Sequence, residues 1–305
     1  MKRTNHIPWR FAVAAVLLAA VLCPALAAQL PPVMVVVKPV ANMYSAPTED
    51  TDVVSQAIYA SNVAVLEQQE GWYKIRTSDD YTGWVPSSAL LRPKADVPYG
   101  APAGGLKPSL LTVTSLYANI YREDSVTKHA PLLTVPYGTM LESAVTVQRF
   151  PGGARWHDVR LPDGRHGFIQ SGDVSAPPKP LSIEQTIAEA RRFLGIPYFW
   201  GGTSSFGFDC SGFMQMLVGL RGHTMPRDAG PQAAWDKLTK IEKDQLQPGD
   251  LLYFGASVDK ITHTGMYIGA GQFIHATTHE HPVVQIGRLQ EPYWTRLLVA
   301  CRRLK

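Results

Sequence analysis

The apolar positions of this 305-residue chain follow different patterns along its length. Residues 11–22 form one continuous apolar run, and residues 33–175 alternate between apolar and polar in short stretches. Residues 183–194 hold apolar positions three and four apart, and short apolar stretches that read as strands return from about residue 251. Because alternation predicts strands and a spacing of three and four predicts helices, we expect strands, then helices, then a second sheet.

The first apolar run has the flanks of a signal peptide. A basic segment precedes it, and Ala25-Leu26-Ala27 supplies a small-x-small cleavage site after it. The run is too short for a comfortable transmembrane helix. We therefore predict that residues 1–28 are removed and that the protein is exported, to the periplasm or outside the cell, with no membrane anchor afterwards.

Residues 33–175 contain an internal repeat. The segment around Trp72 is repeated around Trp156. Gly83-Trp84-Val85 is likewise repeated as Gly167-Phe168-Ile169, and each follows the Trp of its own copy at the same separation. Two small β-barrels are the economical interpretation, because closing a sheet hides its edges. These copies resemble bacterial SH3-like domains, in which we expect the Trp residues to pack rather than to serve as ligand platforms.

Two stretches divide the mature chain: residues 93–108 are rich in Pro and Gly, and residues 176–180 are rich in Pro. Such linkers are semi-rigid, so they space domains apart. We expect a first SH3-like barrel at residues 29–95, a second at 106–176 and a further domain at 181–305.

The last domain is predicted to be α+β. Ser182 and Gln185 give a capping-box signal, the helix that follows buries Ile183, Ile187, Ala190 and Leu194, and Gly195 ends it. A second helix begins near Cys210. Strands are expected near residues 251–254, 263–269, 272–276, 283–287 and 296–302. Helices followed by an antiparallel sheet are typical of this fold class.

Charge and cysteine content exclude several functions. Without the leader, 26 Lys and Arg face 25 Asp and Glu, a net charge of +1, which argues against a nucleic-acid partner. Two cysteines, Cys210 and Cys301, do not make a disulfide scaffold. Cys301 lies in an apolar strand and is read as an inert thiol, although a disulfide with Cys210 is an alternative. Cys23 raises the alternative of a lipid-anchored protein, but the small residues that normally precede a lipidated cysteine are missing here.

Cys210 is the candidate nucleophile. It lies in the first turn of a predicted helix, where the helix dipole should lower the thiol pKa. His263 and His275 lie on two strands that a hairpin at residues 269–271 would make neighbours. A thiol, a base and a group that orients the base form a catalytic triad, although each histidine taken alone would by default be a core residue.

The C-terminal domain resembles the NlpC-type cysteine peptidases of bacterial cell walls, which share a papain-like core. The shared motifs are Pro197-Tyr198-x-Trp200-Gly201-Gly202, Asp209-Cys210-Ser211-Gly212-Phe213, Pro226-Arg227-Asp228, Leu246-x-Pro248-Gly249-Asp250-Leu251, His263-x-Gly265-x-Tyr267 and His275-Ala276. With two barrels in front, the whole chain resembles γ-D-glutamyl-L-diamino-acid endopeptidases of the dipeptidyl-peptidase VI type. Those enzymes cut murein stem peptides that carry a free N-terminal L-Ala, between D-Glu and the diamino acid.

The resemblance implies a cysteine endopeptidase, and we expect a monomer that needs no cofactor. It assigns Cys210 as nucleophile, His263 as the base, His275 as the group that orients it and Tyr198 as an oxyanion donor. A backbone N–H near Cys210 would assist Tyr198.

The resemblance also implies a substrate site. Asp209 and Ser211 would hold the free amine, and Arg227 would grip the free carboxylate of D-Glu. An acidic residue and a Tyr from the first barrel would close the far end, for which Glu49 and Tyr81 are the candidates. Ala229 stands where close relatives commonly have Ser.

Three alternatives stay open at this stage. His279 and His281 near His275 suggest zinc, but no Cys or Asp partner is in place, so we expect no metal. The barrels could form a wall-binding module with a regulatory peptidase domain. A papain-like core could also serve an amidase or acyltransferase acting on another amide.

Overall fold

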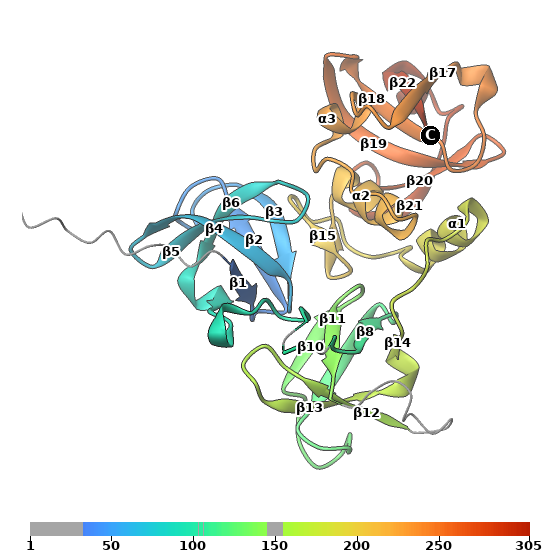
Figure 1. The fold of residues 1–305 in the computed structure, drawn as a ribbon. Coiled ribbons are helices and arrows are strands. Elements are labelled where there is room, and N and C mark those ends of the chain that lie inside the picture. The colour runs from blue at the N-terminus through green and yellow to red at the C-terminus, as the bar shows by residue number, and fades with distance from the viewer. Residues whose placement is uncertain (1–32, 103, 106, 145–154) are drawn as a thin grey trace, which may run out of the picture.

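The computed structural model describes residues 33–102, 104–105, 107–144 and 155–305. The predicted signal peptide and Cys23 lie outside these residues. Among the described helices, none is both long and apolar enough to span a bilayer. The described chain forms three large sheets arranged around a common junction (Figure 1).

The first sheet is antiparallel, has seven strands and follows the order β3-β2-β6-β5-β4-β1-β7. Its strands are β1 Val33–Val36, β2 Val40–Tyr44, β3 Val53–Ile58, β4 Asn62–Gln69, β5 Trp72–Arg76, β6 Thr82–Pro86 and β7 Leu90–Leu91.

The second sheet repeats the first strand for strand, in the order β10-β9-β13-β12-β11-β8-β14. Its strands are β8 Leu110–Val113, β9 Tyr117–Tyr121, β10 Leu133–Pro136, β11 Met140–Ser143, β12 Trp156–Arg160, β13 His166–Gln170 and β14 Val174–Ser175. The ring pair also repeats, since Tyr44 meets Trp72 at 5.7 Å and Tyr121 meets Trp156 at 5.5 Å, both edge to face. Both sheets are SH3-like, as the sequence repeat predicts.

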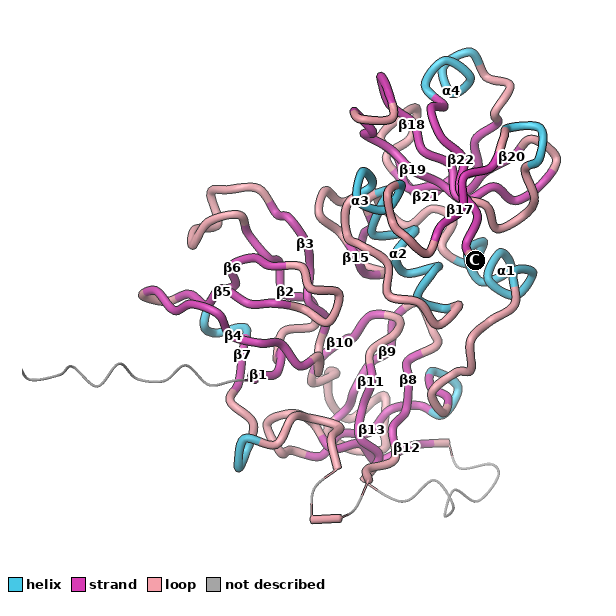
Figure 2. Tube along the Cα trace, turned by 45° about the horizontal axis from the view of Figure 1, so that its top comes forward, coloured by secondary structure: helices cyan, strands magenta, loops and turns pink. Residues whose placement is uncertain are grey.

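The third unit has the predicted α+β, papain-like arrangement, with helices packed on an antiparallel sheet (Figure 2). Its sheet has the order β17-β22-β18-β19-β20-β21. The strands are β17 Leu238–Ile241, β18 Leu251–Ser257, β19 Lys260–Gly269, β20 Gln272–Thr277, β21 Val283–Arg288 and β22 Leu298–Leu304. The helices are α1 Ile183–Arg192, α2 Cys210–Leu220, α3 Ala229–Ala233 and α4 Pro292–Leu297, and a small hairpin pairs β15 Thr203–Ser204 with β16 Gly207–Phe208.

Short 3₁₀ turns lie at Ser87–Ala89, Lys94–Asp96, Ser171–Asp173 and Lys243–Gln245. All three large sheets fall within the domain ranges expected from the sequence, although the exact bounds remain predictions.

Some local expectations need correction. The capping box at Ser182 and Gln185 is confirmed, but α1 ends at Arg192, so Leu194 lies beyond the helix and is exposed. The fully buried Phe193 fills the core there instead. The last strand begins at Leu298 rather than 296, because Pro292 starts the short helix α4 in front of it.

The core of the third unit lies between α2 and the sheet. α2 is apolar on several faces, and it packs against β19 and β20. Its fully buried side chains Phe213, Met214 and Leu217 join a cluster that includes Met266 and Ile274 from those two strands. This burial fixes the start of α2 relative to the middle of the sheet.

The β15–β16 hairpin joins the three units at their junction (Figure 1). Gln56 on β3 accepts hydrogen bonds from the Thr203 backbone at 3.0 Å and from Ser204 at 3.2 Å. Ser205 donates to the Leu116 carbonyl oxygen of the second barrel and accepts from the Tyr137 backbone at 3.0 Å. Both barrels are therefore tied to the segment that leads to α2.

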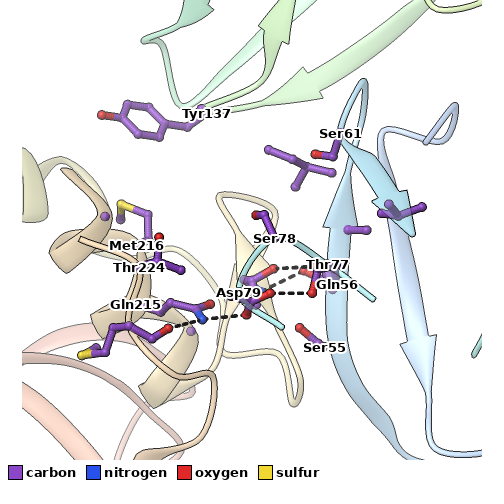
Figure 3. Close-up of a pocket in the computed structure, with 18 of the residues that line it drawn as sticks. Ser55, Gln56, Ser61, Thr77, Ser78, Asp79, Tyr137, Gln215, Met216 and Thr224 are labelled. Atoms are coloured by element: carbon purple, nitrogen blue, oxygen red, sulfur yellow. Dashed lines mark hydrogen bonds between the residues drawn. The ribbon is translucent and has the colours of Figure 1, made fainter. Parts of the chain in front are cut away.

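A cavity of about 410 Å³ lies at this junction, between β3, Tyr137 and α2. Figure 3 shows Gln215 reaching from α2 toward Asp79 of the first barrel. The Gln215 amide donates to Asp79 Oδ2 at 2.8 Å and to the Met225 carbonyl oxygen at 2.9 Å. These contacts hold the first barrel against the same helix that begins at Cys210.

Candidate active site

The local sequence fixes Cys210 at the first position of α2. Asp209 is the N-cap, and its Oδ1 accepts the Gly212 backbone N–H at 2.7 Å. A Cβ on Gly212 would lie 2.1 Å from the Gly202 carbonyl oxygen, so only glycine lets the preceding turn pack this closely on the helix. These contacts fix the first turn of α2, where Cys210 lies.

The Cys210 thiol is buried, with 8% of the residue exposed. Burial raises the thiol pKa to about 12, the charge of Asp209 adds to the rise, and backbone hydrogen bonds from Thr264 and Ser211 oppose it. The expectation that the helix dipole lowers this pKa is wrong for the structure described, because desolvation outweighs it. Both described cysteines, Cys210 and Cys301, are free, which removes the disulfide alternative.

His263 and His275 meet across the β19–β20 pair, as the predicted hairpin requires. Their rings share a hydrogen bond between His263 Nε2 and His275 Nδ1 at 2.8 Å. If His263 is to accept the thiol proton at Nδ1, its Nε2 must carry hydrogen and donate to His275.

The surroundings of this pair are aromatic. Trp294 stacks on His263 with centroids 5.1 Å apart, and it meets His275 edge to face at 4.9 Å. Burial lowers the pKa of His263 to about 3 and lowers the pKa of His275 well below its ordinary value. Both imidazoles are therefore neutral near pH 7.

The Cys210 sulfur contacts the strand that carries His263. Thr264, whose backbone hydrogen bond reaches the Cys210 thiol, directly follows His263. Tyr198 lines the same cleft as Cys210. Burial, and then the charge of Cys210, raise the pKa of Tyr198, so its hydroxyl stays protonated and can donate a hydrogen bond.

A cleft of about 570 Å³ opens over Cys210. The third unit supplies most of its wall, and the first barrel closes one end with Asp52 and Tyr81. Tyr81 donates to Asp228 Oδ2 at 3.1 Å. This end of the cleft is therefore acidic, with two exposed carboxylates.

The position of the acidic barrel residue differs from the expectation. Glu49 is exposed and is not among the described residues that line the cleft, whereas Asp52 from the same loop is. Asp228 was not expected in the cleft, although it belongs to the motif Pro226-Arg227-Asp228. Loop residues of this kind carry no periodic pattern, so only the packing of the first barrel on the third unit reveals which carboxylates line the cleft.

Arg227 does not face the cleft as expected. It is 2% exposed, its Nη1 and Nη2 donate to Asp209 at 3.1 and 2.6 Å, and its Nε donates to Ser55 at 3.2 Å. Nη1 also donates to Ser211 Oγ at 2.8 Å, so four of the five guanidinium N–H groups are engaged and no pair is left for a substrate carboxylate.

Asp209 is equally engaged. Its carboxylate also accepts from the Gly201 backbone at 3.0 Å, the Gly212 backbone at 2.7 Å and Ser211 Oγ at 3.2 Å. Together with Arg227 these donors satisfy both oxygens, so Asp209 is a poor counter-charge for a substrate amine. Ser211 and Ala229 line the cleft.

Comparison with known proteins comes from both sequence and structure. Residues 195–303 match the NlpC/P60 family, and residues 43–90 match the bacterial dipeptidyl-peptidase SH3 domain. A γ-D-glutamyl-L-lysine dipeptidyl-peptidase of Bacillus cereus is 31% identical over 82% of this chain and 74% of its own length. One of Bacillus subtilis is 30% identical over 83% and 82%. The crystal structure of an NlpC/P60 family protein from Bacillus cereus is similar with a TM-score of 0.75 at 26% identity, over 89% of this chain and 99% of that one.

Proposed function

Because this chain belongs to the NlpC/P60 family and is a cysteine peptidase, we propose that it hydrolyses the γ-D-glutamyl–diamino acid bond of murein stem peptides that begin with a free L-Ala. The observation that carries the proposal is the acidic end of the cleft, formed by Asp52, Tyr81 and Asp228. Two carboxylates at a closed end favour an ammonium group and leave room for only a short acyl portion. The names of the two Bacillus relatives support the same bond.

The first half of the reaction forms an acyl-enzyme. His263 Nδ1 takes the Cys210 proton as the sulfur attacks the γ-carbonyl carbon of D-Glu. The protonated hydroxyl of Tyr198 donates to the developing oxyanion. Collapse breaks the C–N bond, the imidazolium returns its proton to the leaving amine, and a thioester remains on Cys210.

The second half releases the product. His263 takes a proton from water, the hydroxide attacks the thioester, and L-Ala-γ-D-Glu leaves as the thiol is restored. Throughout, His275 accepts the His263 Nε2 hydrogen and so keeps Nδ1 directed to the reacting atoms.

We assign the remaining residues as follows. Asp52 and Asp228 hold the substrate ammonium, with Tyr81 fixing Asp228. The buried Asp209–Arg227 pair positions the start of α2 and does not contact substrate directly. The leader pattern and the cell-wall relatives support action outside the cytoplasm, in the periplasm or beyond.

The test uses the mature enzyme and the peptide L-Ala-γ-D-Glu-L-Lys, followed by mass spectrometry. We expect release of Lys, loss of turnover in Cys210→Ala, and at least tenfold lower kcat/KM when the Ala amine is acetylated. Asp52→Asn should lower kcat/KM on the free peptide by roughly tenfold, as expected when a counter-charge is lost.

Glu49→Gln is the matched control, because it removes the same charge from the same loop outside the cleft. Equal cleavage of free and acetylated peptides would contradict the recognition of the amine. An effect of Glu49→Gln equal to that of Asp52→Asn would contradict the assignment of Asp52.

A further inference from the structure

The cleft over Cys210 continues beyond Trp200 into a second cavity of about 410 Å³. Three residues line both spaces, namely Tyr198, Trp200 and Thr262. Cys210 belongs to the first space and His263 to the second. The two spaces therefore adjoin each other, one at the nucleophile and the other at the base.

The chemistry of the proposed reaction decides which half of the substrate enters which space. The acyl half stays on the sulfur, on the side that ends in Asp52 and Asp228. The amine half leaves with the proton that His263 returns, so it occupies the side that holds His263.

We infer that this second cavity binds the side chain of the amino acid on the leaving side, and that aromatic ring faces recognise an ammonium group at the end of that side chain. This inference rests on the proposed function and adds the substrate class that the leaving side selects.

The lining of the cavity supports this assignment. Trp200 is 68% exposed and Tyr293 is 38% exposed, which is unusual for large rings that pack a core. His279 stacks on Tyr293 with centroids 3.9 Å apart and planes 4° apart, which holds the Tyr293 ring in place. Stacking on His279 thus fixes the Tyr293 ring and covers one of its faces, and the exposed Trp200 ring lines the same cavity.

Charge at the two ends of the cleft differs. Of the described residues that line the second cavity, none is Asp, Glu, Lys or Arg. The faces of aromatic rings attract an ammonium group even where the protein offers no carboxylate. A substrate side chain that also carries a carboxylate would meet no Lys or Arg in this cavity. The carboxylates at the acyl end suit the α-amine, and the rings at the other end suit an aliphatic chain that ends in an amine.

Helix α4 gives the cavity its position. Its Trp294 is buried under the His263 ring, and the neighbouring Tyr293 turns outward at right angles to it, with centroids 4.8 Å apart and planes at 87°. One short helix thus carries both the ring that packs beneath the base and the ring that would meet the leaving group.

The experiment measures kcat/KM of the mature enzyme on L-Ala-γ-D-Glu-L-Lys and on the same peptide with L-norleucine, which lacks only the terminal amine. We expect the wild type to prefer Lys. Tyr293→Ala should reduce the Lys-to-norleucine ratio roughly 3- to 30-fold, the range of a single ammonium–ring contact. Tyr293→Phe keeps the ring face and should retain most of the ratio.

Tyr117→Ala is the matched control, since it removes a tyrosine that is 60% exposed on the second barrel. Thermal unfolding of each variant verifies that it is folded. If both peptides are cleaved and Tyr293→Ala leaves the ratio unchanged, or lowers both rates equally, the inference is overturned while the proposed function stands. If neither peptide is cleaved, the proposed function fails, and this inference fails with it.

Discussion

At the residue scale, burial acts in opposite directions on the thiol and on the imidazoles. It raises the pKa of Cys210 to about 12 and lowers the pKa of His263 to about 3. Each shift favours the neutral form, because a low-dielectric environment disfavours charge of either sign. The resting site is therefore a thiol beside an imidazole, and the proton moves when the sulfur attacks.

The same burial predicts how stability depends on pH. His275 is buried and its folded pKa lies well below the ordinary value of 6.5, so between those two values the unfolded chain binds the proton and the folded chain does not. The contribution of neutral His275 to the stability of the fold is therefore present above pH 6.5 and is lost as the pH falls. As the pH falls from 6.5 to 5, we expect protonation of this residue in the unfolded chain to lower the free energy of unfolding.

Urea unfolding at a series of pH values measures this contribution. His275→Gln should make the decline between pH 6.5 and 5 shallower than in the wild type. His281→Gln, at an exposed position, is the control for the substitution itself. Equal slopes in wild type and His275→Gln would contradict a neutral, buried His275.

At the scale of elements, the start of α2 depends on the pair between Asp209 and Arg227. Removal of one partner from a buried pair leaves an uncompensated charge, which costs roughly 3–5 kcal/mol. We therefore expect Arg227→Met to lower the free energy of unfolding by about that amount and to lower kcat through displacement of Cys210. Arg227→Lys should recover part of the stability, because it restores the charge without the two-pronged geometry.

The control is Arg92→Met, which breaks an exposed pair with Asp96. Exposed pairs contribute little to stability because water screens them, so this variant should unfold close to the wild type. Similar losses in the two variants would show that Arg227 is not the anchor of α2.

At the scale of the whole molecule, the first barrel must sit close to the turn before α2 for the cleft to have a closed end. Gly201 permits this approach, since its φ is +76° and a Cβ there would lie 2.4 Å from the Val53 carbonyl oxygen on β3. Neither the backbone angle nor the space suits another residue.

Gly201→Ala should therefore push β3 away from the turn. We expect a loss of about 1–3 kcal/mol in the free energy of unfolding and faster amide hydrogen exchange across Val53–Ile58. Gly172→Ala, where a Cβ meets nothing within 4 Å, is the matched control. If the amide hydrogens of β3 exchange at the same rate in the two variants, the contact between Gly201 and Val53 does not hold the first barrel in place.

Much of the fold follows from short-range patterns in the sequence. The repeat around Trp72 and Trp156 predicts two similar sheets, and the capping signal at Ser182 predicts the start of α1. The strands of the third unit also lie close to their expected positions, because turn chemistry and short apolar runs act over a few residues. The short helix α4 was missed, since six residues give too little periodicity to separate it from the strand behind it.

The order of motifs along the chain was enough to single out Cys210, His263 and His275, since the spacing of two strands and a tight hairpin already makes the histidines neighbours. Only the tertiary structure decided that Arg227 turns inward to Asp209, that Asp52 rather than Glu49 faces the cleft, and that Tyr293 borders a second cavity. Desolvation and contact between distant segments depend on how whole units pack. Those quantities are long-range, so no local pattern of residues encodes them.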